Sequence, residues 1–255
     1  MNFNTFLLGG LIAATIAPIA VYTLSEAEES AESEPQEIVQ TATETATINQ
    51  SNIEPAAIAP AQLSQIDQLQ ATNNCMDCSL AGADLSDLDL SRTNLSRANL
   101  TQTNFSQSQL VNAVLYQAQL ESAQLIEVKA IGADFGKANL SQADLTRSQL
   151  MAINLIQANL DQAILTGVEL REAALNNATL QNAELTNASL YGAILRDANF
   201  QGANLQGADL RYTDLTDANF QGANLAGVQL EGAILPDGSN YSGSDDILLL
   251  SGDGQ

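Results

Sequence analysis

The 255-residue chain contains no histidine and no tryptophan, and aromatic residues make up only 4% of it. Histidine is the usual general base near neutral pH and the commonest metal ligand, so its absence argues against most hydrolases and zinc sites. Basic residues are also scarce, because eight Lys and Arg stand against 30 Asp and Glu, a formal net charge of −22. Such a charge repels nucleic acid phosphates and acidic membrane surfaces, so we expect neither as a direct partner.

The charged residues are spread unevenly along the chain. Residues 1–77 carry ten acidic residues and no Lys or Arg, whereas residues 78–237 carry seventeen acidic residues and all eight basic ones. Residues 238–255 add the remaining three acidic residues. These changes in composition predict boundaries near residues 77 and 237.

One long uncharged apolar run, Phe6–Leu24, lies near the N-terminus. Its 19 residues approach the ~20 that a membrane-spanning helix needs. A cleaved signal peptide is the alternative, because Ser25 and Ala27 place small residues at a candidate cleavage site and the run contains Gly and Pro. A buried helix of a soluble protein is a third interpretation. We predict a signal peptide or membrane anchor at 1–24, with the rest of the chain on the outer side.

The segment between this run and residue 77 has two parts. Residues 25–62 are rich in Glu, Ser, Thr, Ala, Gln and Pro, and they have too few bulky apolar residues to offset the entropy of ordering. We predict a disordered acidic linker there. In 63–77, the apolar residues Leu63, Ile66 and Leu69 fall three apart, which predicts a short amphipathic helix over 63–71 that serves as an N-terminal cap.

The central region repeats every five residues. From Leu80 to Leu235, every fifth residue is Leu or Phe except Ala130, and the position two residues earlier is most often Ala. Neither set contains a charged residue, so we expect both to face the interior. The expected core includes Leu80, Leu100, Phe105, Phe135, Leu160, Phe200 and Phe220.

Neither regular secondary structure suits a period of five. Five steps of a helix rotate a side chain by about 140°, so successive Leu residues would leave any single face. Five residues of a plain strand reverse the face. A chain that bends once in every five residues solves both problems, because it forms a polygonal coil, and such coils stack ~4.8 Å apart through main-chain hydrogen bonds.

The repeated units also resemble a known family. ADLSD at 83, ANLTQ at 98, ADLTR at 143, ANLDQ at 158, ANLQG at 203 and ANFQG at 218 match the A(D/N)LXX pattern of pentapeptide-repeat proteins. The resemblance covers 78–237 and implies an all-β fold, a right-handed quadrilateral β-helix with four units in each turn. On that pattern residues 20 apart stack in columns, so about eight coils are expected, and Phe200 lies next to Phe220.

Two cysteines precede the repeats. Cys75 lies on the Leu register and Cys78 on the Ala register, so both are expected to point inward at the first coil. Their spacing permits a disulfide across a bend, which export would favour. Reduced packing thiols, or a redox or metal role, are the alternatives. This Cys-x-x-Cys also resembles a variant found in exported cyanobacterial members of the family, which implies the periplasm or the thylakoid lumen.

Residues 238–255 form the predicted C-terminal tail or cap. The four consecutive apolar residues Ile247, Leu248, Leu249 and Leu250 are expected either to cover the last coil or to form an end-to-end dimer.

A regular prism without insertions offers no concave pocket for catalysis, so we predict no catalytic residue, cofactor or metal site. The predicted function is a non-enzymatic structural or protein-interaction module, exported or membrane-tethered. It has an unknown protein partner and meets a membrane only through its N-terminal segment.

The resemblance also implies an alternative, a DNA mimic that binds a DNA-processing enzyme in the cytoplasm. However, duplex DNA as long as eight coils, about 38 Å at ~4.8 Å each, carries about 22 charges. Residues 78–237 carry a net charge of only −9. A surface for a small ligand or ion at the end of the solenoid is a third hypothesis.

Overall fold

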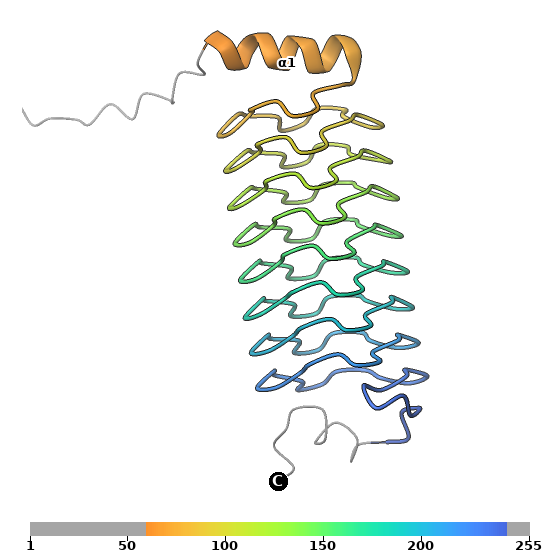
Figure 1. Cartoon of the computed structure of the whole chain (residues 1–255). Helices are drawn as coiled ribbons and strands as arrows, with labels where there is room; N and C mark the ends of the chain where they lie inside the picture. The colour runs from red at the N-terminus through yellow and green to blue at the C-terminus, as the bar shows by residue number, and fades with distance from the viewer. Residues whose placement is uncertain (1–59, 244–255) are drawn as a thin grey trace, which may run out of the picture. The chain divides into compact units, whose positions relative to one another are not determined.

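A computed structural model of the chain describes residues 60–243 (Figure 1). The predicted signal peptide or anchor, most of the linker at 25–62, and the apolar run Ile247–Leu250 lie outside these residues. Within them a single α-helix, α1 (Pro60–Thr72), is followed by stacked coils. No helix in this part of the chain has the length and hydropathy needed to cross a membrane.

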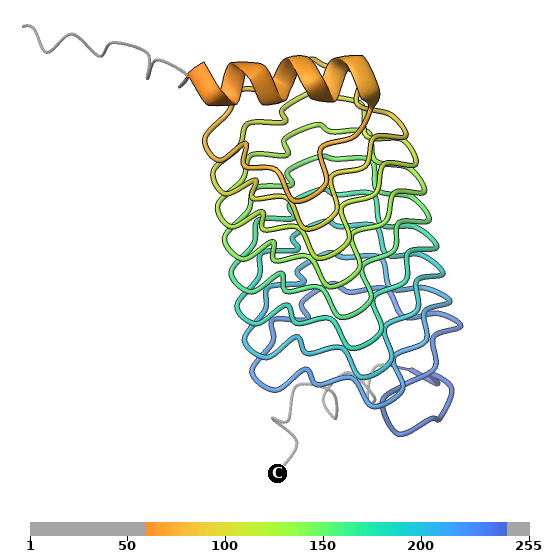
Figure 2. The ribbon, with the colours of Figure 1, turned by 45° about the horizontal axis from the view of Figure 1, so that its top comes forward.

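Residues 20 apart pair along the stack. An unbroken series of parallel bridges, one every five residues, runs from Asn74↔Asn94 to Asp214↔Ile234. The N–H of Leu80 donates to the carbonyl of Asn99 at 2.8 Å, and the N–H of Asn99 donates back to the carbonyl of Cys78 at 2.8 Å. Each coil is therefore joined to the next through alternating main-chain hydrogen bonds. Figures 1 and 2 show the coils stacked one on another.

Each five-residue unit ends in the same tight turn. The N–H of Ala83 donates to the carbonyl of Leu80 at 2.9 Å, and the same bond recurs in unit after unit. The second residue after the Leu position has a positive φ in every unit from Asp77 to Gly232, including the non-glycine residues Arg92 (60°) and Tyr212 (58°). This left-handed residue turns the chain so that the next Ala and Leu again face inward.

Four successive units make one coil. We number the faces of the coil by its Leu positions, so that face 1 contains Leu80, face 2 Leu85, face 3 Leu90 and face 4 Leu95. Residues 20 further along the chain lie on the same face, and a set of residues spaced by 20 is called a column below.

The interior consists of the Leu and Ala positions. Phe105, Leu160 and Phe200 are fully buried, and the other expected core residues Leu80, Leu100, Phe135 and Phe220 are at most 2% exposed. The rings of Phe200 and Phe220 stack with centroids 4.9 Å apart and planes inclined by 2°, as the 20-residue period predicts. The interior is therefore one continuous apolar core, as the absence of charge at the Leu and Ala positions predicts.

Threonine and serine replace Ala at several interior positions, and most of their hydroxyls are hydrogen-bonded. Thr93 and Thr213 each donate to the carbonyl three residues earlier, at 2.6 Å, and Thr103 donates to the carbonyl of Leu80 at 2.8 Å. Ser108 is different, because its buried Oγ has no hydrogen-bond partner among the described residues. Interior hydroxyls thus mainly pair with the turn carbonyls, which limits the cost of burying them.

The predicted helix over 63–71 is α1, which begins three residues earlier and ends one residue later. Pro60 occupies the first position, where a missing N–H costs nothing. Asn73 ends the helix with φ 52°, and its N–H donates to the carbonyl of Leu69 at 2.8 Å. Leu69 is fully buried, and Ile66 packs against the same core. Helix α1 therefore lies against the first coil, as Figure 2 shows.

Candidate protein-interaction surface

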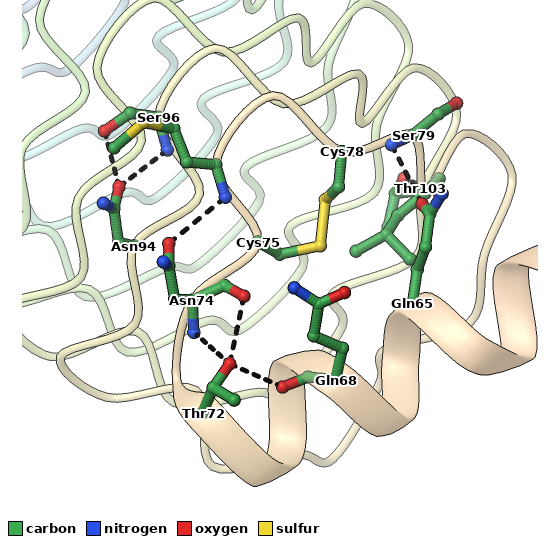
Figure 3. The surroundings of a disulfide bond; sticks show 12 residues. Gln65, Gln68, Thr72, Asn74, Cys75, Cys78, Ser79, Asn94, Ser96 and Thr103 are labelled. Atoms are coloured by element: carbon green, nitrogen blue, oxygen red, sulfur yellow. Dashed lines mark hydrogen bonds between the residues drawn. A yellow bond between two sulfur atoms is a disulfide. The ribbon is translucent and has the colours of Figure 1, made fainter.

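A disulfide joins Cys75 and Cys78 at the start of the stack, with Cα atoms 5.3 Å apart (Figure 3). Cys75 is 3% exposed and its N–H donates to the carbonyl of Asn94 at 2.8 Å. Figure 3 shows Gln65 and Gln68 of α1 projecting toward this coil. The disulfide is thus part of the packing between α1 and the first coil.

The outward side chains do not form a metal-binding cluster in the described part of the chain. No group of three or more Cys, Asp or Glu residues there is placed to hold an ion. Arg147 pairs with Glu127 at 3.0 Å, and other basic residues pair with acidic ones in the same way.

Face 1 is almost uncharged. Among its outward positions only Glu121 and Asp161 carry a charge, and Asn, Gln, Ser and Thr fill most of the others. Asn159 Nδ2 donates to Asn139 Oδ1 at 3.1 Å, and Asn219 Nδ2 donates to Asn199 Oδ1 at 3.1 Å. Neighbouring coils thus share an amide ladder on this face.

Faces 3 and 4 have a different composition. They hold seven of the eight Lys and Arg residues, all three tyrosines of the repeats, and six of the seven large apolar side chains that are exposed within the described residues. The exposed apolar side chains on these two faces are Met76, Val114, Met151, Ile156, Ile194 and Tyr212. Tyr, Met and Arg are enriched in the cores of protein–protein interfaces, so this side of the stack is the candidate binding surface.

One column brings apolar, aromatic and basic side chains together in consecutive coils. Immediately after the Leu position of face 3, between Ser91 in the first coil and Glu231 in the last, successive coils place the side chains Val111, Ile131, Met151, Arg171, Tyr191 and Arg211. We call these six residues the corner column, because they lie at the turn between faces 3 and 4. Each is exposed or half-buried. The equivalent column of face 1 contains only Ala, Thr, Ser, Gln and two acidic residues.

Ring contacts hold the C-terminal half of the corner column, which consists of Arg171, Tyr191 and Arg211. The guanidinium groups of Arg171 and Arg211 lie 5.9 and 5.7 Å from the ring centroid of Tyr191. The Tyr191 ring also meets Tyr212, with centroids 5.2 Å apart and planes inclined by 56°. A Cβ on Gly232 would lie 2.7 Å from the Tyr212 ring, so only glycine leaves room for it. These contacts fix Tyr191 between two cations, while Tyr212 remains 60% exposed.

The two arginines differ in their electrostatic surroundings. Arg211 donates from Nε and Nη2 to the two carboxylate oxygens of Asp209, both at 2.8 Å. This hydrogen bonding lowers the pKa of Asp209 and raises the pKa of Arg211. Arg171 has no carboxylate oxygen within 4.0 Å among residues 60–243. The charge of Arg171 helps to lower the pKa of Asp209, but within residues 60–243 its guanidinium has no hydrogen-bond partner, so its donors can meet an external acceptor.

A second ion pair lies on face 4 beside this surface. Arg196 Nε donates to Asp214 Oδ2 at 2.6 Å, and Thr216 donates to the other carboxylate oxygen at 2.6 Å. Burial raises the pKa of Asp214, but the bonds from Thr216 and Arg196 outweigh it and leave that pKa lowered. Asp214 is thus ionised, and both of its carboxylate oxygens already accept hydrogen bonds from Arg196 and Thr216.

The comparisons with known proteins agree with the repeat geometry. A family model described as pentapeptide repeats matches eight copies in the chain. The chain belongs to the pentapeptide-repeat family. The matches lie within 78–235 and include the segments 78–117, 108–147, 118–155, 143–182, 153–190, 163–202 and 198–235.

Membership confirms the resemblance seen in the sequence, and it implies a right-handed quadrilateral β-helix. Pentapeptide-repeat proteins are generally structural or interaction modules rather than enzymes. The parallel bridges at intervals of 20 residues are what four units in each turn require.

Several solved pentapeptide-repeat structures are similar to this chain. HetL of the cyanobacterium Nostoc sp. strain PCC 7120, involved in regulating heterocyst differentiation, is 35% identical over 66% of this chain and 89% of its own, with a TM-score of 0.33. A trypsin-treated variant of QnrB1, a plasmid-mediated fluoroquinolone resistance protein, is 20% identical over 62% of this chain and 80% of its own, with a TM-score of 0.54. The QnrB1 likeness shows the fold alone. A search of curated proteins gives no match.

The family does not by itself locate a binding surface, and the five-residue period does not reveal the corner column. Its members are 20 residues apart and become neighbours only when four units close one coil. The signal in the sequence is the run of Val, Ile, Met, Arg, Tyr and Arg at every twentieth residue from 111 to 211.

Proposed function

We propose that this protein is a non-enzymatic protein-interaction module whose binding surface is the corner column with its flanks on faces 3 and 4. The observation that carries the proposal is the unequal distribution of Tyr, Arg and apolar side chains over the four faces. Such residues at the centre of an interface supply most of its binding energy. The rigid stack holds them in fixed positions, which lowers the entropy cost of binding.

The column favours a particular kind of protein partner. Val111, Ile131 and Met151 offer an apolar strip, so the partner needs apolar side chains opposite them. Arg171 lacks an ion pair within the described residues and is presented on Tyr191, so it suits a carboxylate of the partner. We therefore propose a partner segment in which an apolar stretch is followed by an acidic residue.

The cytoplasmic DNA mimic is less well supported by the distribution of charge. A mimic requires acidic residues in regular lines along the stack. From Asp77 to Asp237 the acidic residues are spread as two on face 1, five on face 2, five on face 3 and six on face 4. On faces 3 and 4 these acidic residues are mixed with seven basic residues. This arrangement favours a mixed protein interface over a mimic of duplex DNA.

The proposed scaffold for this surface is a stack of about eight coils that α1 caps. The repeats span 160 residues, and one turn takes 20. Burial of Leu69 in α1 supports the capping role, as does the bond from the N–H of Ser79 to Gln65 Oε1 at 3.0 Å. A capped end protects the stack from pairing with other chains.

We also propose that the repeats lie outside the cytoplasm, either exported or tethered by residues 1–24. The apolar run and the disulfide support this placement. Cell fractionation of a chain tagged at its C-terminus is expected to place the tag in the extracytoplasmic or membrane fraction, accessible to added protease on the outer side. A full-length product in the cytosol would overturn this part of the proposal.

The interaction surface is tested by removing its centre. The double substitution Arg171→Ala with Tyr191→Ala is expected to weaken partner binding by at least about 10-fold, because both side chains lie at the middle of the proposed contact. Proteins captured with the tagged full-length chain are identified by quantitative mass spectrometry. Binding of each purified candidate is then measured by titration calorimetry.

The matched control is Gln181→Ala with Gln201→Ala. These residues occupy the same register on face 1 and lie in the same part of the stack. Partners should be retained by this control. A partner lost with the control variant, and kept when Arg171 and Tyr191 are removed, would place the binding surface on another face and refute the proposal.

A further inference from the structure

The two ends of the stack differ in how their main-chain groups are paired. At the N-terminal end, side chains of α1 bond to the first coil. The N–H of Ser79 donates to Gln65 Oε1 at 3.0 Å, and the N–H of Asn74 donates to Thr72 Oγ1 at 3.3 Å. Thr72 in turn donates to the carbonyl of Gln68 at 2.7 Å. The helix therefore provides partners for an otherwise open edge.

The C-terminal end has a row of N–H groups without such partners in the described residues. In the coils above, these positions donate to the next coil, as Phe200 does to Asn219 at 2.7 Å and Gly202 does to Gln221 at 3.0 Å. In the last coil, the equivalent groups have no acceptor within residues 60–243. They are the N–H groups of Phe220, Gly222, Leu225, Gly227, Leu230 and Gly232. Faces 1, 2 and 3 thus end in an open strand edge.

The core is also less covered at this end. Leu and Phe side chains in the middle of the stack are 0–1% exposed, whereas Leu225 is 5% and Val228 is 8% exposed. The small side chains Ala218 and Ala223 rise to 7% and 8%. Residues 60–243 therefore leave apolar side chains at the last coil partly exposed, and six main-chain donors border them.

The chain itself turns back over this end. The N–H of Leu235 donates to the carbonyl of Ser239 at 2.7 Å, and Ile234 pairs with Asn240 in an antiparallel bridge. The N–H of Tyr241 then donates to the carbonyl of Ala233 at 3.0 Å, and Tyr241 packs against the core. This antiparallel return pairs with the edge of face 4 in the last coil.

We propose that residues 244–250, SDDILLL, close the C-terminal edge of the same molecule. The carbonyls of this segment accept hydrogen bonds from the open N–H groups, and its apolar residues cover the last coil. Leu250 is nine residues beyond Tyr241, a reach of about 30 Å when the chain is extended, whereas one five-residue face spans at most about 17 Å. The segment therefore reaches the core from where the described chain ends. This inference is independent of the corner column.

Amide hydrogen exchange of the full-length chain tests this closure directly. In the wild-type protein, the amides of Leu225 and Leu230 are expected to be protected. The double substitution Ile247→Asp with Leu249→Asp is expected to speed their exchange by about 10-fold or more. The amides of Leu205 and Leu210, one coil above, should keep their protection. Deletion of residues 251–255 is the control, because it leaves the apolar run intact and should change neither set.

A second measurement separates the tail from a second copy of the chain as the occupant. Sedimentation at several concentrations is expected to show the wild type as a monomer while Leu225 and Leu230 are protected. Two results would overturn the proposal. One is unchanged protection in the Asp variant. The other is protection that appears only at concentrations where the chain dimerises, which would assign the edge to end-to-end pairing through Ile247–Leu250.

Discussion

Replacing Phe200 by Ala is expected to lower the free energy of unfolding by about 3–5 kcal/mol. The Phe200 side chain is fully buried, and its ring stacks on Phe220 with centroids 4.9 Å apart. The substitution removes apolar surface from the interior and leaves a cavity between two coils. The loss of the aromatic pair adds to this cost. A small side chain at this Leu position therefore interrupts the continuous core of Leu and Phe side chains.

Urea unfolding followed by circular dichroism measures this effect. The control is Gln201→Ala, which changes the next residue in the chain. The Gln201 side chain points away from the core, and its amide makes only a 3.5 Å contact with Gln221. We expect the control to change stability by less than about 0.5 kcal/mol. Equal, small changes in the free energy of unfolding for the two substitutions would mean that the Leu and Phe positions do not form the core.

The inward registers could be predicted from the sequence because burial excludes charge at every one of them. A Leu or Phe every five residues, with a small residue two before it, permits only a chain that bends once in each unit. The number of sides is a different matter. It depends on the angle of each turn, and that angle is set by a left-handed residue that is often not glycine, such as Arg92 or Lys137. Because these residue types seldom adopt positive φ, the four-sided coil came from the family resemblance rather than from the residues.

The helix was predicted in the right place but with shorter bounds. The prediction followed the apolar spacing of Leu63, Ile66 and Leu69, which marks the buried stripe and not the ends. Pro60 and Asn73 are the end signals, since Pro suits the first position of a helix and Asn tolerates the left-handed conformation after the last. Such signals locate helix ends better than the apolar pattern does.

The candidate binding surface was not predictable from the five-residue period. Met151, Arg171 and Tyr191 look unrelated when the units are compared in order along the chain. They form one column because hydrogen bonding between coils brings residues 20 apart together. An outward position is free to vary within each unit, so only the closed coil shows which outward residues act together.

The central claim is that residues 20 apart are neighbours along a four-sided stack, and engineered cysteine pairs test it most directly. Asn139 and Asn159 form a parallel bridge on face 1 and share a side-chain hydrogen bond of 3.1 Å. Neighbouring strands lie ~4.8 Å apart, within the range that a disulfide can span. Asn139 and Gln149 are closer in sequence but belong to opposite faces, 1 and 3.

The pairs Asn139→Cys with Asn159→Cys, and Asn139→Cys with Gln149→Cys, are oxidised in parallel, and peptide mass spectrometry identifies the disulfides apart from Cys75–Cys78. We expect nearly complete cross-linking within one molecule for 139 with 159, and none for 139 with 149. Cross-linking of 139 with 149, or none of 139 with 159, would contradict the 20-residue coil.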